Sequence, residues 1–292
     1  MKICNFESTF EFILRNLTST SPIGIFDSGY GGLTVFRNIA DKLPQYDYLY
    51  LGDNARSPYG GRSFETVHAY TWQCVQWFFN QGSPLVILAC NTASAKALRT
   101  IQQLNLPNSA DPSRRVLGVI RPTTEVLGAI SRTGKVGIMA TKGTVTSRSY
   151  PIELEKFWPG VEVYQQACPQ LVPLIENNEH HNRGGRYFID KYTHALMEKN
   201  GDIDTVLLAC THYPIIADVI EEALPAGVKV LSQGALVADS LADYLQRHPE
   251  LEERISKNGV KKFMTTDDPI DFDNHASLFY GENIQSEQVH FT

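Results

Sequence analysis

The chain carries one motif twice, as Leu85-Val86-Ile87-Leu88-Ala89-Cys90-Asn91-Thr92 and as Val206-Leu207-Leu208-Ala209-Cys210-Thr211-His212. Each copy is a compact apolar run, typical of a buried strand in a parallel sheet, followed at once by a cysteine and small polar residues. Ligands bind outside the carboxyl ends of the strands in open α/β sheets. We therefore expect the two thiols to face each other across one substrate. One thiol would take a proton from a carbon, and the other would return a proton to its opposite face.

A second pair of stretches repeats at a similar offset. Ile23–Gly29 and Val136–Gly143 each indicate a strand that runs into a turn of small residues. A repeat of this length indicates two related domains and not a solenoid; the alternative is that any α/β protein repeats strand-to-loop patterns. We expect an α/β fold of two parallel-sheet domains. The chain is divided into an N-terminal extension (1–21), a first domain (22–114 with 232–292) and a second domain (115–231).

Strands alternate with helices along the chain, which favours parallel sheets covered by helices. The clearest helix is predicted from Arg62 to Gln81, with Ser63 as its N-cap and Gly82 closing it. A helix over Ser232–Gln246 is expected to pack back on the first domain. The extension is expected to form either a short amphipathic helix or a partly ordered tail. Further strands are predicted at 48–51, 116–120, 135–139, 161–164, 206–208 and 228–231.

The composition is that of an ordinary globular protein. Of 292 residues, 42% are hydrophobic and 20% are charged, and the net charge of −6 provides no basic surface for nucleic acid. The sequence contains no stretch long enough to span a membrane and no signal peptide. Five scattered cysteines suit free thiols in a reducing cytoplasm, and the lack of CxxC and HExxH patterns argues against a metal site. We expect a cytoplasmic protein without nucleic-acid, membrane or metal partners.

The five cysteines differ in their surroundings. Cys74 is in line with apolar residues of the predicted helix and is expected in the core, while Cys4 and Cys168 lack polar neighbours. Cys90 and Cys210 precede helix-start sequences, where free backbone N–H groups and the helix dipole favour a thiolate. A thiol pKa lowered from about 8.5 would suit a base near neutral pH, so this pair is the candidate acid/base pair.

Polar loops follow several of the other predicted strands. Asp27–Gly32 is either an anion-binding turn or a purely structural one, and the Asp27 carboxylate can orient an ammonium group or carry a proton. Asp53 adds a carboxylate in a second loop, for which a surface turn is the alternative. The hydroxyls and amides of Thr141–Thr146 suit carboxylate binding without requiring it.

Two histidine-containing segments allow two interpretations each. His212, two residues after Cys210, is either an acid or proton shuttle beside the thiol or a packing residue near Pro214. The segment Asn177–Arg186 contains a histidine pair, and we interpret it as a solvated loop and not as a metal site. Glu176, just before that segment, has the pattern of an ordinary exposed glutamate.

Six motifs in series resemble the cofactor-independent aspartate/glutamate racemase family. They run in order along the chain and, with the C-terminal helix, cover most of it. The resemblance implies two α/β domains related by a pseudo-twofold axis, with the active site in the cleft between them. The motifs are FDSGYGGL (26–33), YLGDNARSPYGGRS (50–63), ILACNTASA (87–95), ATKGTVTS (140–147), CPQLVPLIE (168–176) and LLACTHYP (207–214).

The resemblance also implies roles for individual residues. Cys90 and Cys210 would be the acid/base thiols, Cys90 acting on D-glutamate and Cys210 on L-glutamate. The other implied catalytic residues are Asp27 and His212, which assist the thiols, and Asp53 and Glu176, which tune these groups, Glu176 by holding His212. The implied substrate contacts are Asp27, Ser28, Tyr59, Gly60, Asn91, Thr92, Thr144, Thr211 and His212.

The activity implied by the resemblance is cofactor-free racemisation of glutamate, which supplies D-glutamate for peptidoglycan synthesis in the cytoplasm. The alternatives are an aspartate racemase of the same family, a single-cysteine decarboxylase or isomerase, and a non-catalytic two-domain binding protein. His212 favours glutamate over aspartate, and paired thiols have no purpose in a binding protein. The sequence departs from the family pattern in its extra leader and at Val119–Thr124, where a Pro-Gly-containing turn is usual. It leaves the oligomeric state open, a homodimer included.

Overall fold

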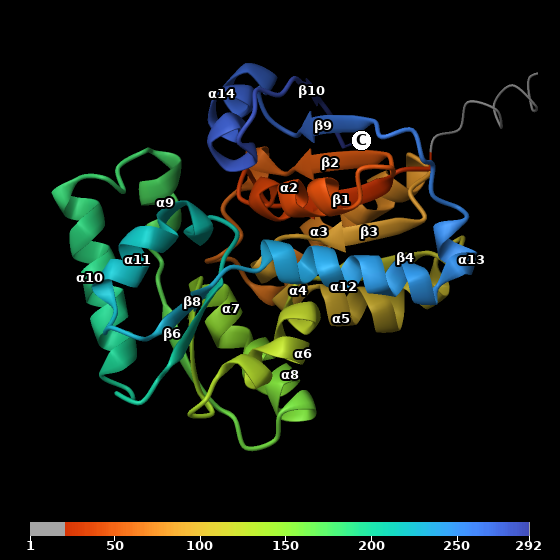
Figure 1. Cartoon of the computed structure of the whole chain (residues 1–292). Coiled ribbons are helices and arrows are strands. Elements are labelled where there is room, and N and C mark those ends of the chain that lie inside the picture. Colours follow the sequence, from red (N-terminus) through yellow and green to blue (C-terminus); the bar gives the residue numbers. More distant parts are fainter. Residues whose placement is uncertain (1–20, 292) are drawn as a thin grey trace, which may run out of the picture.

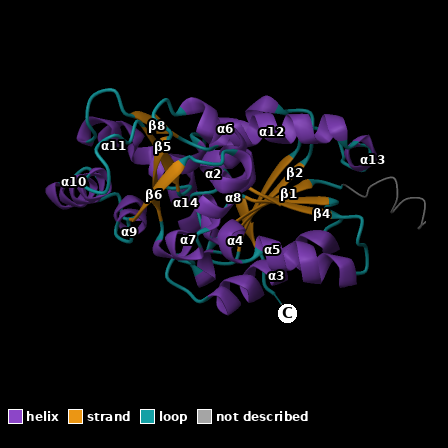
Figure 2. Ribbon diagram, turned by 90° about the horizontal axis from the view of Figure 1, so that it is seen from below, coloured by secondary structure: helices purple, strands orange, loops and turns teal. Residues whose placement is uncertain are grey.

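The computed structural model describes residues 21–291 and contains two parallel β-sheets (Figure 1). The larger sheet has the strand order β10-β9-β2-β1-β3-β4, and the smaller has the order β6-β5-β7-β8. Helices cover both faces of the larger sheet (Figure 2). The strands are β1 (Ile23–Asp27), β2 (Tyr48–Gly52), β3 (Leu85–Leu88), β4 (Arg115–Gly118), β5 (Lys135–Ala140), β6 (Glu162–Ala167), β7 (Thr205–Ala209), β8 (Lys229–Leu231), β9 (Lys261–Thr265) and β10 (Ser286–Gln288).

Helices fill the connections between these strands. The longer ones are α2 (Leu33–Lys42), α3 (Phe64–Asn80), α6 (Ile120–Ile130), α8 (Ser149–Phe157), α10 (Arg183–Met197), α12 (Gly234–Arg247) and α14 (Pro269–Tyr280). The shorter ones are α4 (Asn91–Lys96), α5 (Leu98–Thr100), α7 (Lys142–Ser147), α9 (Leu171–Glu176), α11 (Ala217–Ala223) and α13 (Pro249–Glu252), with single turns η1 (Asn54–Arg56), η2 (Ile101–Asn105), η3 (Leu106–Asn108) and η4 (Tyr213–Ile216).

The two sheets share one strand order. The first four strands of the chain lie in the order β2-β1-β3-β4, and the next four lie in the order β6-β5-β7-β8. Cys90 therefore follows the third strand of one sheet, and Cys210 follows the third strand of the other. The expected α/β fold with two parallel sheets is confirmed, and the common order supports an internal duplication. Strands β9 and β10 extend only the larger sheet, beyond β2.

Alternate side chains of the buried strands enter different hydrophobic cores. In β1, Ile23 and Ile25 pack in a core that also contains residues of α2 and α12, whereas Phe26 packs with residues of α3. The first of these cores continues into the smaller sheet, because Met139 and Leu208 belong to it as well. A continuous apolar layer therefore joins the two sheets on the side of α2 and α12.

The chain crosses between the sheets twice. The first crossing follows β4 at residues 118–120, and the second joins β8 to α12 at residues 231–234. Because β4 pairs with β3, from Leu85↔Arg115 to Leu88↔Gly118, residues 115–118 lie in the six-stranded sheet, although the sequence assigned them to the second domain. The apolar run of β4 identifies a strand but contains no information about which sheet it joins. The rest of the domain division stays a prediction.

Local sequence signals account for most of the elements. Helix α3 begins after Ser63, whose hydroxyl accepts a hydrogen bond from the Thr66 N–H, and it ends before Gly82, which has φ 89°, so both predicted caps are confirmed. The unusual segment Val119–Thr124 forms the start of α6. The leader over residues 1–20 lies outside the described residues. In residues 21–291, no helix is both long and apolar enough to cross a membrane.

Candidate active site

Cys90 lies directly after β3 and caps the N-terminus of α4. Its sulfur accepts a hydrogen bond from the Ala93 N–H at 3.4 Å and lies 3.4 Å from the Ser28 hydroxyl. Ser28 belongs to the loop after β1, and β1 pairs with β3, so the sheet itself brings the two side chains together. The thiol is 5% exposed.

The sequence predicted a lowered pKa for Cys90, and the structure contradicts this. Burial, together with negative charge on Asp27 and on Cys210, raises the pKa of the Cys90 thiol to about 12, against hydrogen bonds from Ser28 and Ala93 that lower it. The short helix α4 supplies the expected N–H group, but desolvation of a buried thiolate outweighs it. Cys90 is therefore a protonated thiol at neutral pH.

Asp27 joins the two halves of the site. One carboxylate oxygen accepts the Gly29 N–H at 3.0 Å, and the other lies 3.5 Å from the Thr211 hydroxyl, which follows β7 in the other sheet. Burial raises the pKa of the Asp27 carboxyl, while the charge of His212 and the backbone hydrogen bonds lower it. Asp27 is thus a fully buried carboxylate whose nearest cation comes from the opposite half of the molecule.

Cys210 has a different set of partners from Cys90. Its sulfur lies 3.9 Å from Nδ1 of His212, and Nε2 of the same ring lies 2.8 Å from the Glu176 carboxylate at the end of α9. Burial lowers the pKa of His212, but the hydrogen bonds and charges of Cys210 and Glu176 outweigh burial and raise it to about 10. His212 is therefore an imidazolium between two acidic groups, and Glu176 is not the isolated surface residue that its local sequence indicates.

The loops around the thiols also touch across the boundary between the halves. The Thr92 hydroxyl lies 3.0 Å from that of Thr141, the N-cap of α7, and the Gly143 N–H donates to the Gly60 carbonyl at 2.8 Å. Thr144 is fully buried beside Thr141, with the two hydroxyls 3.2 Å apart. The structure thus brings these predicted substrate contacts together where the two sheets face each other.

Asp53 and Tyr59 form a separate buried network. The Tyr59 hydroxyl donates to the Asp53 carboxylate, which also accepts from Arg56 Nε at 2.7 Å and from the Thr266 hydroxyl at 2.9 Å. The Tyr59 side chain therefore points to Asp53, so its contribution to a ligand would come from its backbone. The carboxylate of Asp53 is occupied by these partners and bonds neither thiol. Its expected tuning of the thiols stays a prediction; its backbone N–H donates to the Asp27 carbonyl at 3.0 Å.

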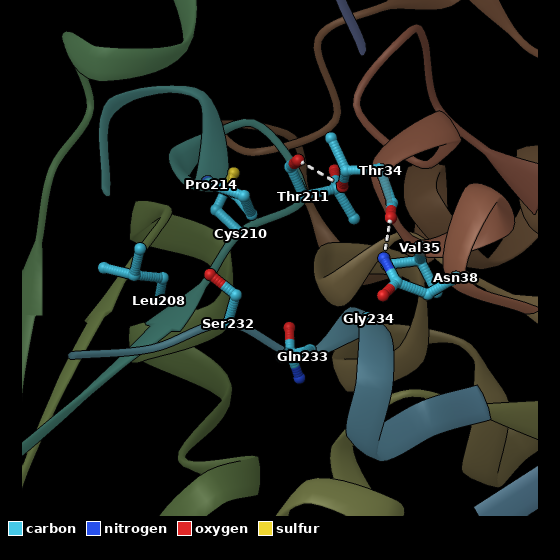
Figure 3. A pocket seen from close by; sticks show the side chains of 10 residues that line it. All are labelled: Thr34, Val35, Asn38, Leu208, Cys210, Thr211, Pro214, Ser232, Gln233 and Gly234. Carbon is cyan, nitrogen blue, oxygen red and sulfur yellow. Dashed lines mark hydrogen bonds between the residues drawn. The ribbon is translucent and has the colours of Figure 1, made fainter. Parts of the chain in front are cut away.

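A small cavity lies behind Cys210 (Figure 3). It has a volume of about 40 Å³, enough for a water molecule and too small for an amino acid. Its wall includes Thr34, whose hydroxyl donates to the Thr211 carbonyl at 2.8 Å. Since Cys90 and Cys210 are each 5% exposed, a substrate reaches them only when the surrounding loops move.

Other residues singled out in the sequence form no hydrogen bond with either thiol of the pair. Cys74 is fully buried in the core beside Arg56, as expected, and Cys168 is buried after β6. Most residues of the polar segment after α9 are exposed, His181 included, but His180 is buried, with the centroids of the two rings 4.0 Å apart. Within residues 21–291, no group of three or more His, Cys, Asp and Glu side chains has an arrangement that could hold a metal ion.

Two buried residues at the site were missed by the sequence analysis. Tyr150 of α8 and Gln233, which precedes α12, both bond the side chain of Asn91. Each is remote from Asn91 in the sequence, and neither belongs to a polar strand-end loop of the kind that drew attention to the others. No local signal could have found them.

Comparison with known proteins extends over most of the chain. The family described as Asp/Glu/Hydantoin racemase matches residues 23–241. A curated glutamate racemase from Caulobacter sp. (strain K31) is 39% identical over 282 residues, covering 91% of this chain and 99% of its own. The glutamate racemase structure from Bacillus anthracis has a TM-score of 0.83 at 31% identity, covering 93% of this chain and 98% of its own. That of the Francisella tularensis enzyme, in complex with D-glutamate, has a TM-score of 0.81 at 31% identity, covering 94% and 98%.

Proposed function

The chain belongs to the Asp/Glu/Hydantoin racemase family, and from that premise we propose that it interconverts L-glutamate and D-glutamate without a cofactor, with Cys90 and Cys210 as the two acid/base groups. The observation that carries this proposal is the equivalence of the two thiols. Each follows the third strand of its sheet in chain order, and each has its own set of polar partners within its own half.

In the direction from L-glutamate, Cys210 acts as the base. Its thiolate is stabilised by the His212 imidazolium, which Glu176 holds at 2.8 Å, and it takes the α-proton. Cys90 then donates its own proton to the opposite face of the α-carbon. A raised pKa suits Cys90 to this step, because it starts as a thiol.

In the direction from D-glutamate, the two thiols must start with their protonation states exchanged: Cys90 has released its proton to solvent, and Cys210 has taken one up. The Ser28 hydroxyl and the Ala93 N–H are the donors that stabilise the Cys90 thiolate as it forms. Asp27 opposes that charge while it is ionised, and its raised pKa lowers the cost by favouring its protonated form. Cys210 then protonates the opposite face. Removal of the α-proton therefore depends on Cys210 in one direction and on Cys90 in the other.

The α-proton of an amino acid is a very weak acid, and an acid and a base in position contribute only about 10²–10⁴-fold to its removal. Further stabilisation must come from donors aimed at the substrate carboxylates in a site that excludes water. The buried hydroxyls of Thr92, Thr144 and Thr211 and the backbone around Gly60 are our candidates for these donors. We place the reaction in the cytoplasm, as a supply of D-glutamate for peptidoglycan synthesis.

The test is incubation of extensively dialysed protein with L-glutamate in D₂O, without pyridoxal phosphate or added metal. We expect the product to be D-glutamate that carries deuterium at the α-carbon. Chiral chromatography measures the configuration of the product, and mass spectrometry measures its deuterium content. Racemisation of aspartate but not of glutamate would keep the thiol mechanism and overturn the substrate. Binding of either amino acid without α-deuterium exchange would overturn the enzyme assignment in favour of a binding protein.

A further inference from the structure

Three buried side chains form a closed ring of hydrogen bonds. Asn91 Nδ2 donates to Gln233 Oε1 at 2.6 Å, Gln233 Nε2 donates to the Tyr150 hydroxyl at 2.8 Å, and that hydroxyl donates to Asn91 Oδ1 at 2.6 Å. The three residues are 2%, 3% and 0% exposed, respectively. Water therefore cannot replace a missing partner without opening the interior.

The ring lies where both chain crossings meet the helix that follows Cys90. Gln233 belongs to the second crossing, and its Nε2 also lies 2.9 Å from the Thr123 hydroxyl and 3.2 Å from the Val119 carbonyl at the first crossing. Asn91 is the residue after Cys90 and the first residue of α4. Tyr150 comes from α8, which is attached to the smaller sheet. One polar node thus links Cys90 to each segment that connects the two halves.

The ring also fixes the orientation of the Asn91 amide. Its carbonyl oxygen is held by Tyr150, and one of its two N–H groups is held by Gln233, which leaves the other N–H for a further acceptor. Burial raises the pKa of Tyr150, so its hydroxyl stays a donor at all working pH values. Rotation of the Asn91 amide alone would set carbonyl oxygen against carbonyl oxygen at Gln233. Rotation of both amides would set Gln233 Oε1 against the Val119 carbonyl, which now accepts from Gln233 Nε2 at 3.2 Å, so the ring has one orientation.

We propose that Tyr150 and Gln233 are positioning residues of the reaction: through the ring they fix the Asn91 amide beside Cys90 and hold the two crossings in register, so that the Cys90 thiol keeps its alignment with the α-carbon. This inference rests on the proposed racemisation. It assigns the ring to the Cys90 half of the site, because the ring is hydrogen-bonded to the residue next to Cys90. Gln233 and Cys210 line the same small cavity, but no hydrogen bond joins the ring to Cys210, His212 or Glu176.

The test variant is Tyr150→Phe, which removes one hydroxyl at nearly constant volume. We expect kcat/KM for racemisation to fall on the order of 10–100-fold, since misplacement by about an ångström has effects of that size. Tyr48→Phe is the matched control, because Tyr48 is also buried and donates one hydrogen bond, to the Leu43 carbonyl, away from the ring. The control should match Tyr150→Phe in its loss of Tm and keep kcat/KM within threefold of the wild type.

Primary deuterium isotope effects separate alignment from general destabilisation. With Cys90 impaired, removal of the α-deuteron of D-[2-²H]glutamate becomes more rate-limiting, so its isotope effect on kcat/KM should rise in Tyr150→Phe while that of L-[2-²H]glutamate should fall. If the ring had a merely structural role, neither isotope effect would change. Gln233→Met breaks the ring at a different residue and should shift the two isotope effects in the same way. The fold-decrease in kcat/KM of the double variant should be smaller than the product of the fold-decreases of the two single variants.

The outcomes separate the two claims. Wild-type protein that does not racemise glutamate would overturn the proposed function and this inference with it. Wild-type turnover together with Tyr150→Phe and Gln233→Met variants that match Tyr48→Phe in kcat/KM, or that lose activity with unchanged isotope effects, would overturn the inference alone. If Tyr150→Phe does not fold, the isotope effects of Gln233→Met decide.

Discussion

The His212 ring lies 2.8 Å from the Glu176 carboxylate through Nε2, although α9 and the loop after β7 are far apart in the sequence. Its other nitrogen faces the Cys210 sulfur at 3.9 Å. Cys90 has a hydroxyl, a backbone N–H and a buried carboxylate around it instead. The two cysteines therefore have different surroundings: Cys210 faces an imidazolium, whereas burial keeps Cys90 a neutral thiol.

Stability should depend on pH through His212. Its pKa in the folded protein, about 10, lies above the ordinary value of 6.5, so its contribution to stability is complete below pH 6.5 and is lost as the pH rises through 10. We expect the Tm difference between the wild type and His212→Asn to shrink steadily across that window. Thermal denaturation in matched buffers measures it.

The control for this measurement is His194→Asn, since His194 is exposed and pairs only with Glu198 on the surface of α10. Its Tm difference from the wild type should stay small at every pH. A His212→Asn difference that is constant, or that grows with pH, would show that His212 is neutral in the folded protein, and the ion pair with Cys210 would have to be abandoned.

Serine at Cys90 or at Cys210, the proposed acid/base groups, should reduce racemisation by about 10²–10⁴-fold, the contribution of a positioned acid or base. Each variant keeps one of the two thiols, so we expect it to retain α-proton exchange in D₂O with only one of the two enantiomers. Cys90→Ser should still exchange the α-proton of L-glutamate through Cys210, and Cys210→Ser should still exchange that of D-glutamate through Cys90. NMR of the α-proton with each enantiomer measures the exchange.

Cys168→Ser is the matched control for the cysteine variants, because Cys168 is a buried thiol at the end of β6, the neighbouring strand of β5, and its Sγ bonds only the Gln166 carbonyl. Its racemisation should stay within threefold of the wild type. Exchange of the same enantiomer by both catalytic-cysteine variants would reject the assignment of Cys90 to D-glutamate and Cys210 to L-glutamate.

The sequence predicted the elements that depend on residues close together in the chain, such as strands and helix caps. The apolar runs before Cys90 and Cys210 are buried strands, and helix α3 has the caps that Ser63 and Gly82 indicate. By contrast, β9 (Lys-Lys-Phe-Met-Thr) and the edge strand β10 (Ser-Glu-Gln) have no apolar run. A strand with neither an apolar run nor a regular apolar–polar alternation has no periodic signal that separates it from a loop.

The parts of the site that could not be predicted depend on tertiary contact. A cysteine at a helix start predicts a lowered pKa, but burial raises the pKa of Cys90 because a thiolate there is poorly solvated. Tyr59 was expected at the substrate, yet its side chain turns to Asp53. The Asn91 ring joins residues from three different elements. Each of these outcomes depends on what packs around the residue, which a single sequence does not contain.

Removal of the Tyr59 hydroxyl should destabilise the fold more than it affects the chemistry. In Tyr59→Phe the buried Asp53 carboxylate loses one of its donors, which we expect to lower the free energy of unfolding by about 1–3 kcal/mol. KM should rise more than kcat falls, because the loop to Gly60 loosens. Urea denaturation and steady-state kinetics measure both.

Tyr30→Phe is the control for this variant, since the Tyr30 hydroxyl donates to Asp271 at an exposed position. Its free energy of unfolding should change by no more than about 0.5 kcal/mol. Equal destabilisation by the two variants would mean that the Asp53 network does not depend on Tyr59.

In the loop after β1, Gly31 lies against the opposite half of the molecule. Addition of a single methyl group at this position should therefore disturb the site. A Cβ at this position would lie 2.4 Å from both His212 Nδ1 and Thr211 Oγ1, so Gly31→Ala must displace the imidazole or separate the two halves. We expect kcat/KM to fall by at least about 10²-fold. The pH-dependent part of the Tm should also shrink, because a displaced His212 loses its contact with Cys210 or Glu176.

Gly201→Ala is the control: nothing lies within 4 Å of its added Cβ, so it should change neither kcat/KM nor the pH dependence of the Tm. A Gly31→Ala variant that retains wild-type kcat/KM would mean that the loop and His212 separate during turnover, and that the contact between them forms no part of the reacting state.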